Sequence, residues 1–192
     1  MQTIVSRNID LTEAAGVVTV GAINGGVRSN IIPEDVTMLG TIRSLSKAQE
    51  AYQIERIKTI VTKTAEAAGA TAMVEAPYSS HYPVTFNNES LTAQMLPSLQ
   101  KAAGMTNVVQ VPPTMGAEDF SFFGEQVPAL YIKIGGMPKG GDPKTAPSHH
   151  TADFFVDESA MKTGIKAFLY LVTDYMQTGS GKMPVKQNKS AK

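Results

Sequence analysis

The stretch Pro147-Ser148-His149-His150-Thr151-Ala152-Asp153-Phe154-Phe155-Val156-Asp157-Glu158 places two adjacent imidazoles between a predicted strand and a predicted helix. Reactive groups are commonly presented at such junctions. Neutral imidazole is a common ligand of zinc and related ions, so the central hypothesis is a metal ligand in this loop. The alternative is a solvated or hydrogen-bonded pair, which is the more frequent state of adjacent histidines in a Pro- and Gly-rich loop.

The residues that follow this stretch predict a helix and then a tail. Asp157 is placed to cap the helix. Its apolar positions should form one stripe, made of Met161, Ile165, Phe168, Leu169, Val172 and Met176. Residues 177–192 are rich in Gly, Ser, Lys and Asn, so we predict that this tail is disordered.

The residues that precede the stretch predict two strands and a further helix. Residues 127–134 form a strand candidate that ends at Gly135-Gly136, and 108–111 form a shorter one. A helix is predicted over 89–103, with a kink or break at Pro97. The change of composition from Tyr82 onward indicates that these elements belong to a second structural unit.

The N-terminal part predicts a small sheet with one long helix. Strands are predicted over 16–23, 35–43 and 71–76, in the order strand, strand, helix, strand. Ser46 and Gln49 form a capping-box pattern before the helix. The helix should present one apolar face, made of Ile57, Ile60, Val61, Thr64, Ala65 and Ala68, and Gly69 suits its left-handed C-terminal position. This order is what remains of a split βαβ sandwich without its first strand and helix.

Composition excludes several classes of function. Seventeen Lys and Arg balance seventeen Asp and Glu, so we expect no nucleic-acid partner and no attraction to an anionic membrane. There are no cysteines, which excludes disulfides, thiolate nucleophiles and cysteine zinc sites. No apolar run approaches the roughly 20 residues that span a bilayer, and the N-terminus lacks a signal-peptide pattern. We expect a soluble protein in an unknown compartment, cytoplasmic by default and periplasmic if a signal precedes this sequence.

Four patches give the chain a resemblance to a known family. In order, they are Gly25-Gly26 with Asn30-Ile31-Ile32-Pro33, Gly40-Thr41-Ile42-Arg43, Met115-Gly116-Ala117-Glu118-Asp119-Phe120, and His150 with Phe154 and Asp157-Glu158. Together they resemble the C-terminal half of the metal-dependent aminoacylase and carboxypeptidase family. The closest resemblance is to its amidohydrolase branch of hippurate hydrolases and indole-acetyl-amino-acid hydrolases. The resemblance covers roughly residues 1 to 176.

The resemblance implies an α/β fold in two parts. Residues 1–81 would be a partial ferredoxin-like (α+β) lid and dimerisation domain that lacks its first strand. Residues 82–176 would be the C-terminal part of a zinc-peptidase-like α/β sheet domain. Enzymes of this family hydrolyse the amide bond of N-acyl amino acids or related conjugates with divalent metals: zinc, or manganese, cobalt or nickel.

The resemblance also implies roles for particular residues. His150 would bind one metal, and His149 would be its neighbour. Asn30 and Arg43 would bind the substrate, Arg43 through its carboxylate. Gly135 and Gly136 would be the backbone beside the substrate, where a missing side chain permits close approach.

Each of these residues also has a structural alternative. Asn30 could be a turn former, Arg43 an exposed strand residue, and the two glycines a strand terminator. Glu118 and Asp119 are expected to cap a helix or support the site, because the family places its general base elsewhere. No catalytic residue is therefore assigned in this chain.

The departure from the family concerns the mechanism. The part that would hold the other metal ligands and the general-base glutamate has no counterpart here, so metal affinity of this chain alone should be weak or absent. The first hypothesis is a fragment of a metal-dependent amidohydrolase that needs a complementary N-terminal half. The second is a non-catalytic assembly module that dimerises through the lid, and the third is an unrelated metal-binding protein using His149 and His150.

Overall fold

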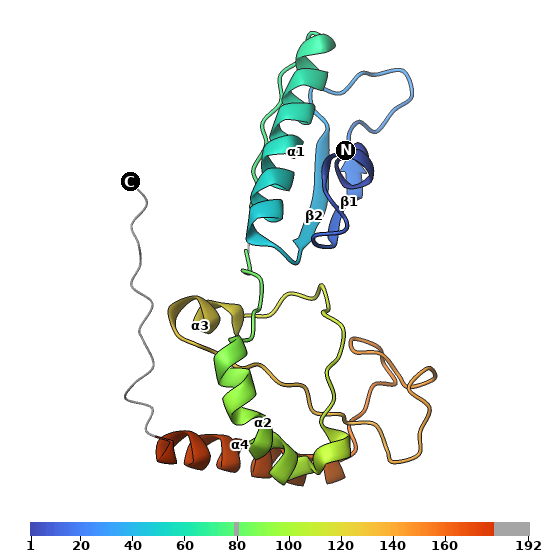
Figure 1. Cartoon of the computed structure of the whole chain (residues 1–192). Helices are drawn as coiled ribbons and strands as arrows, with labels where there is room; N and C mark the ends of the chain where they lie inside the picture. The colour runs from blue at the N-terminus through green and yellow to red at the C-terminus, as the bar shows by residue number, and fades with distance from the viewer. Residues whose placement is uncertain (79–80, 179–192) are drawn as a thin grey trace, which may run out of the picture. The chain divides into compact units, whose positions relative to one another are not determined.

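The computed structural model describes residues 1–78 and 81–178, which form two compact units that we treat separately (Figure 1). Unit 1 contains Met1–Val84 and Pro113–Ser121, and unit 2 contains Thr85–Pro112 and Phe122–Lys192. The fold is mixed α and β, with a small two-stranded sheet. None of the helices in the described ranges has the length and apolar character needed to cross a bilayer.

The predicted division into residues 1–81 and 82–176 stays a prediction, because a compact group of contacts does not show that a segment folds by itself. The predicted disordered tail, 177–192, lies outside the described residues from 179 onward.

The sheet of unit 1 pairs β1 (Gly16–Asn24) with β2 (Thr37–Ser44) in an antiparallel arrangement, which confirms the first two predicted strands. Val18 lies opposite Ile42, and the register shifts between Val20 and Ala22. A side chain at Gly40 would collide with the carbonyl oxygen of Thr19. The glycine of the Gly-Thr-Ile-Arg patch is therefore required by close contact between the strands.

Helix α1 (Lys47–Ala67) begins and ends largely as predicted. Ser46 Oγ accepts a hydrogen bond from Gln49 N at 3.4 Å, which is half of the capping box. The other half does not form, because Ser46 N donates instead to Ser44 Oγ at 3.2 Å, and Gln49 Oε1 accepts from Ser44 Oγ at 3.3 Å. Gln49 Nε2 donates to Ala14 O at 3.0 Å. At the C-terminus Gly69 has a φ of +73°, and Gly69 N and Ala70 N donate to Glu66 O and Ala65 O. This is the Schellman arrangement that a left-handed glycine permits.

The core of unit 1 lies between α1 and the sheet. Its fully enclosed side chains include Ile4, from the short π-helix η1 (Ile4–Asn8), and its other buried members are Val18 and Ile57. Val74 packs against this core, yet residues 71–76 form no strand. That prediction was wrong, because a strand needs a ladder partner and this segment pairs with neither β1 nor β2. The ferredoxin-like arrangement therefore stays a prediction.

Unit 2 is built on α2 (Glu89–Ala103) and α4 (Ser159–Gln177), which pack against each other (Figure 1). Asn88 caps α2 by accepting from Leu91 N at 2.9 Å. Ser98 Oγ donates to Asp174 Oδ2 at 2.7 Å and joins the two helices. The helix runs through Pro97, whose side chain is exposed, so the predicted break is wrong and the predicted kink stays a prediction. The short elements are η2 (Met105–Asn107) and α3 (Ser121–Gln126).

The two strands predicted in unit 2, over 108–111 and 127–134, were wrong, and the described residues of this unit contain no sheet. Asn87 instead holds the second segment. Its Nδ2 donates to Tyr131 O at 2.9 Å, and its Oδ1 accepts from Tyr131 N at 2.7 Å. Asn88 N donates to Ala129 O at 2.9 Å. A side-chain amide therefore satisfies backbone groups for which no neighbouring strand is described.

One buried side chain of unit 1 predicts a stabilising substitution. Gln53 is fully buried in α1, and neither its Nε2 nor its Oε1 has a hydrogen-bond partner among the described residues. An unsatisfied buried amide costs free energy. We expect Gln53→Met to raise the free energy of unfolding by about 1 kcal/mol, measured by urea denaturation.

The matched control is Gln49→Met, one turn earlier in the same helix. This amide is bonded to Ala14 O, so its loss should lower the free energy of unfolding by about 1 kcal/mol. Equal effects of the two substitutions would contradict the assignment of Gln53 as unsatisfied.

Candidate substrate and metal-binding loop

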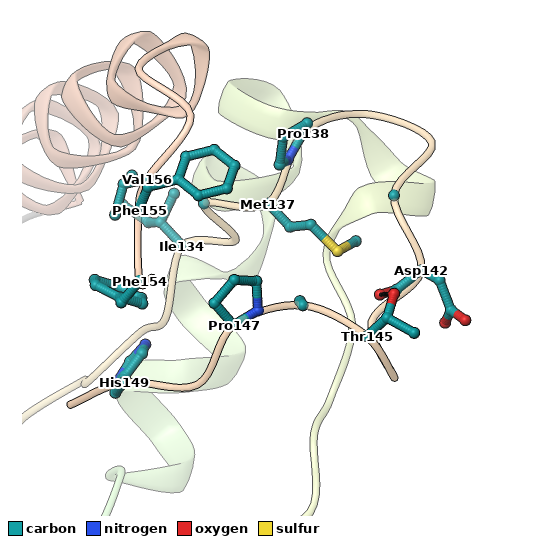
Figure 2. Close-up of a pocket in the computed structure, with 13 residues that line it drawn as sticks. Ile134, Met137, Pro138, Asp142, Thr145, Pro147, His149, Phe154, Phe155 and Val156 are labelled. Carbon is teal, nitrogen blue, oxygen red and sulfur yellow. Dashed lines mark hydrogen bonds between the residues drawn. The ribbon is translucent and has the colours of Figure 1, made fainter. Parts of the chain in front are cut away.

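A pocket of about 320 Å³ lies in the loop region of unit 2 that contains the histidine pair (Figure 2). Pro147, Phe154 and Val156 contribute apolar walls, and the polar lining includes Asp142, Thr145 and His149. Figure 2 shows His149 beside Phe154 on one side of the pocket and Asp142 beside Thr145 on the other. The pocket therefore has an aromatic side and a polar side.

The Gly135-Gly136 segment is fastened to the end of the histidine motif. Asp157 N donates to Gly136 O at 2.7 Å. This hydrogen bond links the glycine segment to the sequence patch that contains His150. The two glycines differ in their surroundings. A Cβ on Gly136 would lie 2.8 Å from Val156 Cγ1, whereas a Cβ on Gly135 would have no heavy atom within 4 Å. Gly136 is needed because a side chain there would collide with Val156. At Gly135 no atom lies close to the position of a side chain, so another molecule could approach the backbone.

The two histidines occupy different positions. His149 lines the pocket, and its ring meets that of Phe154 edge to face, with 4.8 Å between the centroids. His150 does not line this pocket, and both histidines are exposed. Its φ of +67° is uncommon for a residue with a side chain, and such conformations cluster at functional sites.

His149, which the sequence analysis assigned only as a neighbour of the metal ligand, lines the pocket. The motif points to His150, and His149 falls one residue early. Nothing in the sequence indicates which ring faces the pocket, because that depends on the backbone conformation at His150.

A metal ion needs more donors than this loop provides. Catalytic zinc sites use three protein ligands, and the described residues contain no group of three His, Cys, Asp or Glu side chains that could hold an ion. The residues present therefore do not fit a complete metal site, and His150 as a single ligand stays a prediction.

The other predicted substrate residues lie in unit 1. Asn30 is exposed in the loop between β1 and β2. Arg43, near the end of β2, donates through Nη1 to Met115 O at 2.7 Å. The structure thus connects the Gly-Thr-Ile-Arg patch with the Met115–Phe120 patch. Within the latter, Glu118 Oε1 accepts from Phe120 N at 3.2 Å, one residue before α3 begins. This bond satisfies no N–H group of the helix, so the capping or supporting role of Glu118 stays a prediction.

The two glycines give a matched pair of substitutions. We expect Gly136→Ala to lower the free energy of unfolding by about 1–3 kcal/mol, because the new methyl group overpacks against Val156. Gly135→Ala should change it by less than about 0.5 kcal/mol. Thermal or urea unfolding of both variants measures the difference.

A second substitution, at Val156, tests whether overpacking causes the expected loss of stability in Gly136→Ala. If Gly136→Ala acts through Val156, then adding Val156→Ala should remove part of its cost, which a double-mutant cycle detects. Strictly additive effects of the two substitutions would contradict the contact.

The start of α4 gives a prediction about pH. Asp157 Oδ1 accepts a hydrogen bond from Ser159 N at 2.9 Å, and this bond, with a second from the Ser159 side chain, lowers the pKa of Asp157. The ionised group therefore stabilises the fold at pH values above its ordinary pKa, and this stabilisation is lost as the pH falls through the lowered pKa.

We expect Asp157→Asn to be less stable than the natural chain at pH 7. The difference should shrink as the pH is lowered through the acidic range, where both side chains are neutral. Urea midpoints measured from pH 7 to pH 2 test this, and a difference that does not change with pH would contradict the role of the charge.

Comparison with known proteins places this geometry in a family. A model of peptidase family M20/M25/M40 matches residues 8–174. N-acetyldiaminopimelate deacetylase of Leuconostoc citreum is 34% identical over an alignment of 174 residues, and the match covers 88% of this chain and 42% of that protein. Thermostable carboxypeptidase 2 of Saccharolobus solfataricus is 31% identical over 90% of this chain and 42% of its own length. IAA-amino acid hydrolase ILR1-like 2 of Arabidopsis thaliana is 28% identical over 95% and 40%, respectively.

A solved structure shows the same fold. A protein from methicillin-resistant Staphylococcus aureus, described as an aminohydrolase, superposes with a TM-score of 0.79 and 28% identity over 91% of this chain and 43% of its own. This chain spans less than half the length of each of these relatives. The family match extends over most of the sequence and includes all four sequence patches, so the chain belongs to peptidase family M20/M25/M40.

Proposed function

We propose that this chain is part of a metal-dependent hydrolase that cleaves the amide bond of N-acyl amino acids or related conjugates. The names of the relatives support this reaction class, since they refer to removal of an N-acetyl group, to a carboxypeptidase and to an amino acid conjugate. The observation that carries the proposal is the hydrogen bond from Asp157 N to Gly136 O, because it builds the histidine motif and the glycine segment into one loop beside a pocket.

The pocket would take the apolar part of the substrate. Its aromatic side offers the Phe154 ring and the edge of His149, against which a flat or branched apolar group packs well. Gly135 has open space at its Cα, so a substrate backbone could approach it closely. Asp142 and Thr145 would contact a polar end of the same group.

The residues of unit 1 would bind the charged end of the substrate. Arg43 uses Nη1 for Met115 O, and a guanidinium has five N–H donors, which suits simultaneous pairing with a carboxylate. Asn30 would contribute a side-chain amide from its exposed loop. Both roles are part of the proposal.

His150 would be one ligand of a divalent ion, which is zinc, or manganese, cobalt or nickel. The other ligands and the general base would come from the part of the relatives that this chain does not match. Hydrolysis by this chain alone is therefore not expected.

A second candidate function is a non-catalytic assembly module that dimerises through unit 1. It is favoured by the exposed pair Ile23 and Met38, which lie opposite each other on β1 and β2 and are 64% and 53% exposed. A dimer that forms without metal and is lost in Ile23→Asp would support this function.

The amidohydrolase proposal is tested by reconstitution. The chain is mixed with a separate polypeptide that contains the unmatched part of the Leuconostoc citreum deacetylase, and hydrolysis of N-acyl amino acids is assayed with added zinc, manganese or cobalt. We expect activity only in the mixture, abolished by EDTA and restored by metal. His150→Ala should lower kcat/KM more than about 100-fold, because it removes a metal ligand.

The neighbouring histidine is the matched control. His149→Ala should raise KM through the pocket while the dependence on metal remains. Full activity of His150→Ala in the mixture would show that the ligand assignment is wrong. Hydrolysis by the chain alone that EDTA abolishes would show that a complete site exists without the second polypeptide.

A further inference from the structure

Two turns shape the segment over 137–146, which supplies part of the pocket lining. In the first turn, Gly141 N donates to Pro138 O at 3.0 Å. Gly140 is the third residue of this turn and has a φ of +86°, a left-handed conformation that suits glycine. A second turn follows directly at Asp142, whose carbonyl oxygen accepts from backbone N–H groups three and four residues later. Hydrogen bonds within the segment therefore set its path beside the pocket.

The first turn brings the Met137 side chain onto the backbone of Gly141. A Cβ on Gly141 would lie 3.1 Å from Met137 Cγ and 3.2 Å from its Sδ, which is tighter than ordinary van der Waals contact. A side chain at position 141 would therefore displace the thioether. Met137 is 37% exposed and lines the pocket, and Figure 2 shows its thioether extending toward Asp142 and Thr145.

The wall that Met137 forms differs from the aromatic side of the pocket. A methionine side chain is unbranched and has three rotatable bonds, so it adapts its shape to the group that it contacts. The rings of His149 and Phe154, edge to face at 4.8 Å, offer flat apolar contact instead. An apolar chain that enters along Phe154 therefore meets the thioether before it reaches the polar side.

We propose that Met137 determines the length of the acyl group that the pocket accepts, with the acyl chain lying between the Phe154 ring and the Met137 thioether. The open backbone at Gly135 would face the amide end of the same molecule. Beyond the thioether the lining becomes polar at Asp142 and Thr145, where an apolar chain finds no favourable contact. The proposal rests on the proposed function and names the residue that sets its substrate range.

The test uses this chain alone, so it does not depend on hydrolysis. The probes are N-acylalanines whose straight acyl chains lengthen from acetyl to octanoyl. NMR titrations follow the ring signals of His149, which lines the pocket, and give Kd for each probe. The ring signals of His81, which belongs to unit 1, serve as the control for binding elsewhere.

Three variants change the wall in different ways. Met137→Ala enlarges the pocket, and Met137→Leu keeps an apolar side chain of similar volume. Gly141→Ala adds a methyl group that crowds Met137. Met105→Ala is the matched control, because Met105 is a 75% exposed methionine of the same unit that does not line the pocket. Circular dichroism confirms that each variant folds, and the remaining variants decide if one does not.

For the natural chain we expect Kd to fall about fourfold with each added methylene group until the acyl chain reaches Met137, and then to stay constant. Met137→Ala should move this length limit to a longer chain. Gly141→Ala should move it to a shorter one, because the displaced thioether occupies part of the cavity. Met137→Leu and Met105→Ala should leave the limit where it is, since a swap that conserves volume changes packing little.

The same length limit in the natural chain and in Met137→Ala overturns the proposal, as does the failure of every probe to shift the His149 signals. Probes that shift only the His81 signals would place binding in unit 1 and also overturn it. Probes that bind with the expected limits, but that the reconstituted mixture does not hydrolyse, would uphold the role of Met137 and contradict the proposed function. Hydrolysis without any length limit at Met137 would do the reverse.

Discussion

The structure depends on the need of every extended segment to find partners for its backbone N–H and C=O groups. β1 and β2 meet this need by pairing with each other, and α1 covers one face of the pair. The segment over 127–134 meets it through Asn87, whose side-chain amide bonds both polar groups of Tyr131 as a neighbouring strand would. These two hydrogen bonds fix the segment that leads to Gly135 and Gly136. They therefore help to position the loop that forms the pocket.

In the loop that contains His149 and His150, the two adjacent imidazole rings lie in different surroundings. His150 has a left-handed backbone conformation, whereas the ring of His149 packs edge to face on Phe154. His149 therefore forms part of the pocket wall and His150 does not, although both side chains are exposed. Asp157 N donates a hydrogen bond to Gly136 O, which joins the end of this loop to the glycine segment.

The described residues provide a pocket beside the histidine pair, but no group of three side chains that could hold a metal ion. Catalytic zinc sites use three protein ligands, so His150 alone does not make a metal site. The proposed hydrolysis therefore depends on donors other than the described residues.

Local signals in the sequence correctly predicted the elements that depend on neighbouring residues. Ser46 starts α1, Gly69 ends it, and the stripe of α4 follows its helical period, because capping and periodicity act within one or two turns. The four patches were sufficient to identify the family, since their order and spacing are specific even though each is weak.

The tertiary structure decided what depends on distant partners. The segments 71–76, 108–111 and 127–134 have strand composition but no ladder, because pairing requires another strand at hydrogen-bonding distance. Ser44 Oγ takes the place of the Gln49 side chain at Ser46 N, and Pro97 lies within α2, since tertiary contacts outweigh local preference. The face of α4 that is covered, and the histidine that faces the pocket, follow from contacts and backbone angles that exist only once the chain has folded.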